Sequence, residues 1–182
     1  MHISDQELIE GLKTGNRKEA SFNDLVQKYQ ERLYWHIRKI VLNHEDTDDV
    51  LQNTFMKVWK NVENFREESS LFTWLYRIAT NESLTFINQR KRRTIAPLNE
   101  ASDFLQANLE ADEYFDGEDI QKKLQQAILL LPEKQRLVFN LRYFDEMPYQ
   151  EMSEILETSV GALKASYHHA ARKVEDYLSG LE

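Results

Sequence analysis

Cysteine is absent from this 182-residue chain, which excludes disulfide bonds, thiolate zinc sites and thiol catalysis. Long apolar runs are missing too. No stretch approaches the roughly eighteen apolar residues that a membrane-spanning helix requires. A secretory signal begins with a basic segment followed by an apolar one, and residues 1–5 do not begin such a pattern. We therefore expect a cytoplasmic protein that does not insert into membranes.

Signatures of catalysis are also missing. The sequence has no glycine-rich phosphate loop, no clustered His/Asp/Glu site and no arrangement typical of a serine nucleophile. His168 and His169 are adjacent, so they lie about 100° apart on a helix and lack the i, i+4 spacing of a helical metal site. The sequence predicts no enzymatic activity, no metal and no cofactor.

The net charge of −8 comes from one segment. Residues 94–121 contain eight acidic residues and no lysine or arginine. Residues 1–93 hold 15 basic and 14 acidic residues, and residues 122–182 hold 8 and 9. Because the flanking parts are nearly neutral, they can present local basic faces, and overall acidity is weak evidence against nucleic-acid binding.

Hydrophobic spacing of three or four residues recurs along most of the chain, and strand signals are nearly absent. We predict an all-α fold of two small helical domains, residues 1–93 and 122–182, joined by a flexible acidic linker over residues 94–121. A capping box at Ser4 opens the first helix, and residues 43–46 form a polar break. The other expected helices span residues 18–42, 47–62, 71–90, 149–156 and 159–178. Helical spacing also resumes from residue 120, stops at Pro132 and continues at Leu137, Val138 and Leu141.

The predicted helix over residues 47–62 has an apolar stripe that we assign to the core: Leu51, Phe55, Val58 and Val62. Opposite lies a polar face with Asp49, Gln52, Asn53, Met56 and Lys60. This face is either a solvated surface or a docking surface, and an outward methionine beside paired amides favours docking. The pattern alone leaves both interpretations open.

Aromatic residues are frequent in the helix over residues 71–90 and in the loop before it: Phe65, Phe72, Trp74, Tyr76 and Phe86. Most of them are expected in the core. Beside basic residues such as Arg66 and Arg77, however, aromatic rings also suit single-stranded DNA, whose bases stack on rings and whose phosphates meet cations. Asn81 could contact a base edge or satisfy a neighbouring backbone group.

Residues 149–178 predict a helix-turn-helix. Two amphipathic helices are separated by the short turn of residues 157–161, in which Ser159 can cap the second helix. Such a unit places the N-terminal half of its second helix against the major groove of DNA. We expect apolar residues of that helix (Val160, Leu163, Ala170 and Val174) to pack inward. The residues expected to face outward are Lys164, Ala165, His168 and His169.

Three segments, in this order and spacing, resemble the sigma-70 superfamily, and in particular the small extracytoplasmic-function (ECF) sigma factors. They are DDVLQNTFMKVW at residues 48–59, FTWLYRIATN at residues 72–81 and LPEKQR at residues 131–136. The resemblance covers residues 20–93 and 122–178. It implies an RNA polymerase sigma factor that binds core polymerase through the β′ and β subunits, recognises promoter DNA, melts it and starts transcription. It also implies an anti-sigma factor as a further partner.

The resemblance assigns roles at matching positions. Contacts to the β′ coiled coil fall on Asp48, Asp49, Gln52, Asn53 and Met56. Contacts to the unpaired −10 strand fall on Phe65, Arg77 and Asn81. Contacts to the −35 duplex fall on Arg142, Lys164, Ala165, His168, His169 and Arg172. The acidic linker corresponds to the segment that runs through the polymerase toward the RNA exit channel.

The sequence departs from the family pattern at two sites. Asn53 stands where the family usually has an acidic residue. Residues 164–169 read KASYHH, where Lys-Ser-Arg-Leu-x-Arg is commoner, so two arginines are missing. Neutral histidine binds phosphate more weakly than arginine, so we expect −35 DNA binding to depend less steeply on salt concentration than it would with the two arginines. The alternative function is a helix-turn-helix regulator that binds duplex DNA without polymerase.

Overall fold

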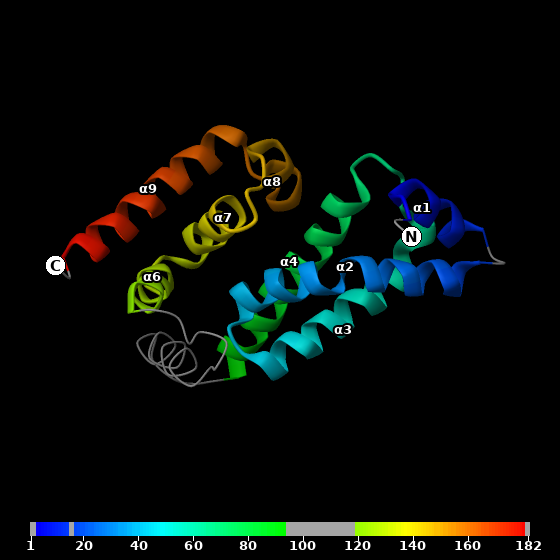
Figure 1. Ribbon diagram of the computed structural model, residues 1–182, viewed down its shortest axis with the longest axis horizontal. Helices are drawn as coiled ribbons and strands as arrows, with labels where there is room; N and C mark the ends of the chain where they lie inside the picture. The colour runs from blue at the N-terminus through cyan, green and yellow to red at the C-terminus, as the bar shows by residue number, and fades with distance from the viewer. Residues whose placement is uncertain (1–2, 15–16, 94–118, 181–182) are drawn as a thin grey trace. The chain divides into compact units, whose positions relative to one another are not determined.

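The computed structural model describes residues 3–14, 17–93 and 119–180. All elements in these residues are helical, which confirms the predicted all-α class. The chain separates into two compact units, Met1–Arg90 and Lys91–Glu182 (Figure 1). Most of the acidic linker, residues 94–118, lies outside the described residues. The elements are α1 (Asp5–Lys13), α2 (Lys18–Val41), α3 (His44–Asn61), the 3-10 helix η1 (Val62–Asn64), α4 (Leu71–Arg93), α6 (Asp119–Leu129), α7 (Glu133–Tyr143), α8 (Tyr149–Leu156) and α9 (Val160–Ser179).

Helix α1 begins with the predicted capping box. The Ser4 hydroxyl accepts a hydrogen bond from the Glu7 backbone N–H, and the Glu7 carboxylate accepts one from the Ser4 backbone N–H. This arrangement satisfies donors that the start of a helix otherwise leaves unpaired. The polar side faces solvent, whereas Leu8, Ile9 and Leu12 are buried against the rest of the first unit.

The connection between α2 and α3 is shorter than the predicted polar break of residues 43–46. Leu42 adopts a left-handed conformation (φ 67°) that ends α2, and the Asn43 side chain caps α3 by accepting from the Asp46 backbone N–H. The helix therefore begins at His44. A residue with good capping chemistry starts a helix immediately, so the polar residues after Asn43 belong to the first turn. Helices α2 and α3 then pack side by side (Figure 1).

The buried stripe of α3 differs from the predicted one. Its fully buried residues are Thr47, Val50, Thr54 and Val58. Leu51 and Phe55, which were assigned to the core, are only half-buried at its margin. The two threonines are accommodated because each hydroxyl donates to the backbone carbonyl four residues earlier, which removes the cost of burying it.

Helix α4 begins at Leu71 because Ser70 caps it: the Ser70 hydroxyl accepts from the Thr73 backbone N–H at 3.0 Å. On its buried side, Thr80 meets the imidazole of His36 from α2 at 2.8 Å between Oγ1 and Nε2. The Tyr76 ring lies beside the same imidazole, with 4.6 Å between ring centroids. A buried polar pair of this kind fixes the rotation of α4 about its own axis, and so decides which residues α4 shows to solvent.

The second unit has its core where α6, α7 and α9 meet. That core contains Ala127, Ile128, Leu131, Phe139, Ala170 and Val174. Pro132 precedes α7, where its fixed φ suits a helix start. Arg136 is only 9% exposed, and its guanidinium lies 3.5 Å from the backbone carbonyl of Leu129 at the end of α6. Burial lowers the pKa of this guanidinium. The LPEKQR motif thus builds the joint between α6 and α7.

Helices α8 and α9 form the predicted helix-turn-helix. Glu157 ends α8 in the left-handed region (φ 51°), and the Ser159 hydroxyl caps α9 by accepting from the Ala162 backbone N–H at 3.3 Å. Met152, Ile155 and Leu163 are buried between the two helices. Leu163, Ala170 and Val174 face inward as predicted, while Val160 is half-buried.

Candidate functional site

A polar face runs along the exposed side of α3. The residues predicted to form it are all exposed, and Met56 reaches 50% exposure. At about 100° per residue they occupy an arc of about 140°. The buried residues Val50, Thr54 and Val58 lie on the opposite side. We define the α3 face as Asp48, Asp49, Gln52, Asn53 and Met56.

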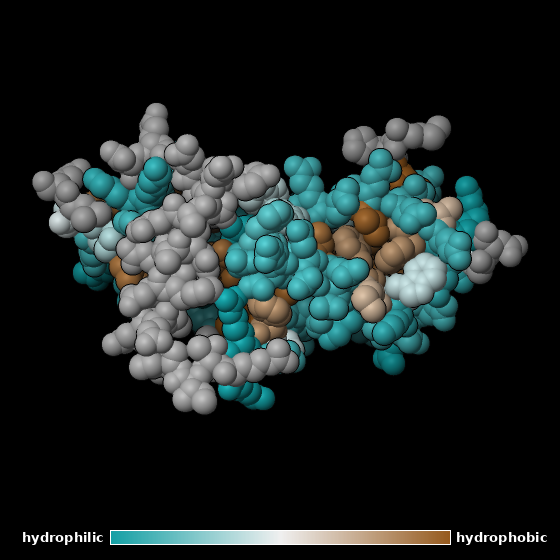
Figure 2. Space-filling view, turned by 90° about the horizontal axis from the view of Figure 1, so that it is seen from below, coloured by the Kyte–Doolittle hydropathy of each residue, from teal (hydrophilic) through white to brown (hydrophobic). Residues whose placement is uncertain are grey.

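Aromatic side chains border the α3 face, and the sequence pattern did not indicate this. Phe22 from α2 packs edge-on against Trp59 and Phe55 of α3, with ring centroids 4.9 and 6.3 Å apart. All three rings are half-buried, so Phe22 and Phe55 are surface residues rather than core residues. Figure 2 shows hydrophobic side chains emerging among hydrophilic ones on this unit. Aromatic residues and methionine are enriched in protein interfaces, so this apolar margin favours the docking interpretation of the α3 face over a purely solvated one.

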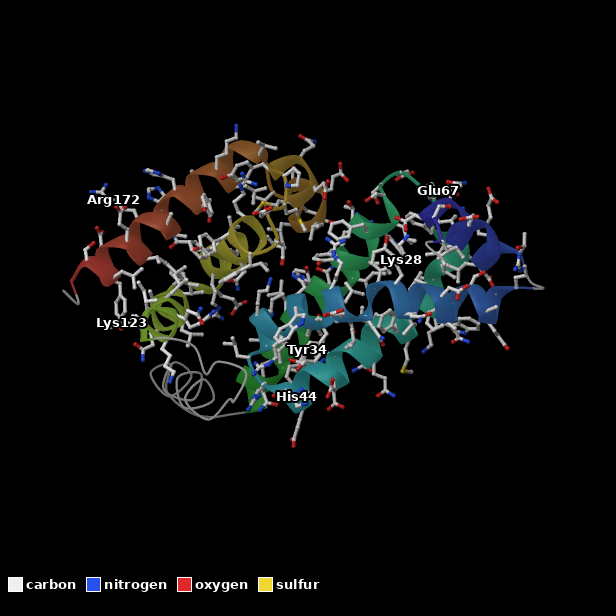
Figure 3. All side chains as sticks on the ribbon, viewed as in Figure 1. Lys28, Tyr34, His44, Glu67, Lys123 and Arg172 are labelled. Carbon is white, nitrogen blue, oxygen red and sulfur yellow. The ribbon has the colours of Figure 1, made fainter. Side chains whose placement is uncertain are left out.

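The N-terminal end of the α3 face is fixed by contacts to α2. The Tyr34 hydroxyl lies 2.7 Å from Nδ1 of His44, and the same nitrogen lies 3.7 Å from a carboxylate oxygen of Asp48 (Figure 3). These contacts join the last turns of α2 to the first turn of α3. They hold the start of the α3 face in register with the rest of the unit.

The residues predicted to contact the −10 strand do not all lie at the surface. Phe65 is only 5% exposed, and its ring packs on Trp74 with centroids 4.9 Å apart. In this conformation neither ring offers a free face to a base, which corrects the expectation for Phe65. The physical reason is that a ring just after η1 gains more by entering the core than by remaining in water.

Arg77 and Asn81 remain available at the surface of α4. Asn81 is exposed and Arg77 is half-buried. They are four residues apart, so they lie one above the other on the same side of the helix. The neighbouring residues Thr80 and Ser83 are buried, so the buried side of α4 is fixed and Asn81 lies on its solvent side. A cation and an amide in this relation suit a phosphate and a base edge.

The outer side of α9 carries the residues predicted to face duplex DNA, all of them exposed. Its buried residues, Leu163, Ala170 and Val174, lie on the opposite side. Figure 3 shows Arg172 projecting outward from α9. We define the α9 face as Lys164, Ala165, His168, His169 and Arg172.

Arg142 makes contacts within the second unit that the sequence did not indicate. It is half-buried, and its Nη1 donates hydrogen bonds to the backbone carbonyls of Glu146 and Met147, each at 3.2 Å. Its guanidinium also lies over the Tyr149 ring, 5.3 Å from the centroid. Glu146 takes a left-handed conformation (φ 50°). Arg142 therefore stabilises the turn into the helix-turn-helix, and we assign it a structural role.

Within residues 3–14, 17–93 and 119–180, no group of three or more His, Asp or Glu side chains is placed to hold a metal ion. No helix among these residues is long and apolar enough to cross a membrane.

The two units match two family models in order. Residues 25–93 match sigma-70 region 2, and residues 121–174 match sigma-70 region 4. The chain belongs to the sigma-70 family, in its extracytoplasmic-function group. Helix α1 lies outside both matches.

Curated relatives match the chain over nearly its whole length. It is 28% identical over 190 residues to the ECF RNA polymerase sigma-E factor of Haemophilus influenzae, covering 98% of this chain and 97% of the relative. It is 28% identical to the RNA polymerase sigma-H factor of Pseudomonas aeruginosa, covering 97% and 95%. The ECF RNA polymerase sigma-E factor of Escherichia coli K12 is also 28% identical, with 98% and 96% covered.

Two solved structures share the fold. CnrH, solved in complex with the cytosolic domain of CnrY, has a TM-score of 0.70 at 21% identity, covering 97% of each chain. The sigma factor RpoE, solved in complex with the anti-sigma factor NepR from Bartonella quintana, has a TM-score of 0.67 at 20% identity, covering 87% of this chain and 96% of that one.

Proposed function

We propose that this protein is an ECF sigma factor that binds core RNA polymerase and directs promoter recognition, DNA melting and transcription initiation. The observation that carries the proposal is the presence of regions 2 and 4 in one chain, each with an exposed polar helix face at the expected position. Domain boundaries at residues 1–93, 94–121 and 122–182 are part of the proposal. The protein acts in the cytoplasm, with polymerase, and has no catalytic chemistry of its own.

The α3 face is the proposed docking surface for the β′ coiled coil. Its carboxylates and amides provide hydrogen-bond acceptors and donors, and Met56 provides an adaptable apolar contact beside the half-buried rings of Phe55 and Trp59. Asn53 contributes an amide where the family usually has a charge. The surface therefore depends on shape and hydrogen bonding together with the charges of Asp48 and Asp49.

Melting is assigned to α4. Extruding a base from the duplex costs a few kcal/mol, and that cost is offset when the base gains stacking and hydrogen bonds in the protein. Asn81 would supply the hydrogen bonds and Arg77 a phosphate contact. Phe65 is not proposed as a base contact, because its ring is used to hold the loop on Trp74.

The −35 duplex is assigned to the α9 face. Lys164 and Arg172 supply charge at the two ends of this face, while His168 and His169 lie between them. With two imidazoles in place of the family's arginines, the α9 face alone should bind duplex DNA weakly. Part of the affinity of the α9 face for the −35 duplex would come from polymerase, which holds region 4 near the promoter and so raises the effective concentration of that face.

Run-off transcription with purified core polymerase on genomic fragments, followed by start-site mapping, tests the proposal. We expect transcripts only when the protein is added, with start sites downstream of a shared pair of promoter elements. A pull-down of core polymerase separates the proposal from a free-standing regulator. Binding to palindromic duplex DNA without any polymerase binding would overturn it.

Asn81→Ala tests the melting role within the holoenzyme. We expect open-complex formation to fall more than closed-complex binding, because the amide is used only after the base leaves the stack. Permanganate reactivity of unpaired thymines reports the first quantity, and footprinting of the −35 region reports the second. Equal losses in both would count against the assignment.

Two further parts of the proposal concern a partner protein and the linker. Both structural neighbours were solved with a second protein, named in one case as an anti-sigma factor, and we propose an anti-sigma partner for this chain as well. The acidic linker, residues 94–121, would follow a basic conduit built for RNA. Replacing its eight acidic residues with Ser and Asn should weaken holoenzyme assembly or shift the yield of abortive transcripts. Unchanged values of both would refute that role.

A further inference from the structure

The α9 face carries two neighbouring imidazoles, those of His168 and His169, and both side chains are exposed. Their ring centroids lie 6.0 Å apart. Within the described part of the chain, neither imidazole takes part in a hydrogen bond or an ion pair. Both rings are therefore open to solvent and to a ligand that approaches this face.

The helices that pack against α9 leave this face uncovered. Helices α6, α7 and α8 meet α9 on its opposite side, where Leu163, Ala170 and Val174 are buried. No charged or titratable side chain of α6, α7 or α8 that the structure describes contacts either imidazole. Tyr149 of α8 meets the face at Lys164 instead, whose Nζ lies 5.8 Å from the centroid of the Tyr149 ring.

The charged residues around the two histidines belong to α9 itself, and all of them are exposed: Lys164, Arg172 and Lys173, with Glu175 and Asp176 about two turns further on. Lysine, arginine and carboxylate side chains keep one charge between about pH 6 and pH 8, whereas imidazole changes its charge in this range. Among the residues of this face, the two histidines are therefore the source of any change of charge near neutral pH.

Protonation changes what an imidazole can do beside DNA. A charge-assisted hydrogen bond to phosphate is roughly twice as strong as a neutral one, so the backbone of the duplex binds the charged ring better than the neutral ring. A complex that favours the protonated form holds more protons than its free components. The affinity of such a complex rises as the pH falls and is lost as the pH rises.

We propose that His168 and His169 make −35 binding proton-linked: the α9 face takes up protons when it binds duplex DNA, so its affinity increases as the pH falls. The inference rests on the proposed function and deepens it, because it adds control by pH to the −35 contacts. Two arginines at these positions would give the face a fixed charge. With two histidines, the charge that meets the phosphates depends on the pH of the cell interior.

The test uses holoenzyme assembled from the full chain and core polymerase, and a duplex that carries the −35 element found by start-site mapping. Affinity is measured between about pH 6 and pH 8 at one salt concentration. We expect log K to fall with pH at a slope of about −0.5 to −1, which is about three- to tenfold per pH unit. Calorimetry in buffers of different ionisation enthalpy counts the protons taken up.

Two double variants separate the histidines from other sources of pH dependence, polymerase included. His168→Gln with His169→Gln keeps the face neutral at these positions, and His168→Arg with His169→Arg keeps it charged. Both should bind with a flatter pH profile than the unchanged protein. The unchanged protein should approach the glutamine variant at the alkaline end and the arginine variant at the acid end. Its slope of log K against log[salt] should also be steeper at the acid end, by up to about 2.

Arg172→Gln is the matched control. Arg172 lies on the same face, four residues after His168, and carries a charge that does not change in this pH range. We expect this variant to bind more weakly at every pH, with the same dependence on pH as the unchanged protein. Urea unfolding of every variant at each pH, followed by far-UV circular dichroism, separates a change in binding from a loss of folding.

Three results would overturn the inference. They are a pH slope in the unchanged protein equal to that of the glutamine variant, a pH slope in the arginine variant as steep as that of the unchanged protein, and a loss of the pH slope in Arg172→Gln. If the unchanged holoenzyme shows no promoter-specific binding at any pH, the proposed function itself fails. That outcome is distinguishable because it appears before any variant is compared.

Discussion

Gly11→Ala tests the close packing of α1 on α2. A Cβ at residue 11 would meet Oγ of Ser21 at 1.9 Å and Cβ of Ser21 at 2.9 Å. Rotating the serine side chain relieves the first contact, but the second involves an atom fixed to the backbone of α2. The two helices would have to separate by several tenths of an ångström, which disturbs the burial of Leu8 and Leu12.

Two opposing terms set the size of the effect. Replacing glycine by alanine inside a helix stabilises it by about 1 kcal/mol. Overpacking a close interface typically costs about 1–3 kcal/mol. We therefore expect Gly11→Ala to lower the free energy of unfolding of the first unit by about 1 kcal/mol, although an alanine there is otherwise favourable.

Tryptophan fluorescence suits this measurement because the three tryptophans of the chain, Trp35, Trp59 and Trp74, all lie in the first unit. Urea unfolding followed in this way reports that unit without a signal from region 4. In a double-mutant cycle, Ser21→Gly removes both atoms that the new Cβ would meet. The double variant should then be more stable than the sum of the single effects predicts, by about 1 kcal/mol or more.

The control is Gly161→Ala on α9, where an added Cβ meets nothing within 4 Å. Followed by far-UV circular dichroism, this variant should be as stable as the unchanged protein or slightly more so. If Gly11→Ala also stabilises its unit, or if the cycle with Ser21→Gly is additive, the close approach of α1 and α2 is not as described and the reasoning fails.

Three further predictions concern charge and packing. The double variant His168→Arg with His169→Arg should make −35 binding by the holoenzyme more salt-dependent, because two more phosphates are neutralised. The slope of log K against log[salt] should become steeper by up to about 2. An unchanged slope would show that these two positions do not face DNA. Leu141 is 0% exposed, so Leu141→Ala should lower the free energy of unfolding of the second unit by about 2–5 kcal/mol, as measured by calorimetry. A loss of less than about 1 kcal/mol would contradict the burial of Leu141. The hydrogen bonds of Glu7 with Ser4 lower the pKa of Glu7 from the ordinary 4.5. The stabilisation of α1 by this carboxylate is therefore present above pH 4.5 and is lost as the pH falls below that value. Glu7→Gln should remove this pH dependence from the hydrogen exchange of α1, and a pH dependence that persists in the variant would assign the effect to another group.

Most helices could be predicted from the sequence because their signals are local. The capping serines Ser4, Ser70 and Ser159 act within three residues, and hydrophobic spacing shows itself in a single turn. The outward residues of α9 followed from the same spacing. The exposure of the polar residues of α3 was also predicted correctly, even though the opposing stripe was placed one residue away, on Leu51 and Phe55.

That displacement has a physical cause. Thr47 and Thr54 read as polar, yet each hydroxyl bonds to its own helix and can be buried, whereas Phe55 meets Phe22 at the surface. Hydrophobicity alone does not record whether a hydroxyl finds an acceptor.

The helices, their caps, the acidic segment and the exposed face of α9 were determined by the sequence itself, because these properties depend on neighbours within about one helical turn. Tertiary structure decided the burial of Phe65 on Trp74, the use of Arg142 to hold a turn, and the pairing of Lys13 with Glu67, 54 residues away in the chain. Each of these depends on residues that only packing brings together. An aromatic ring or a cation has the same local pattern whether it meets DNA or its own protein, and only its position in the folded chain distinguishes the two.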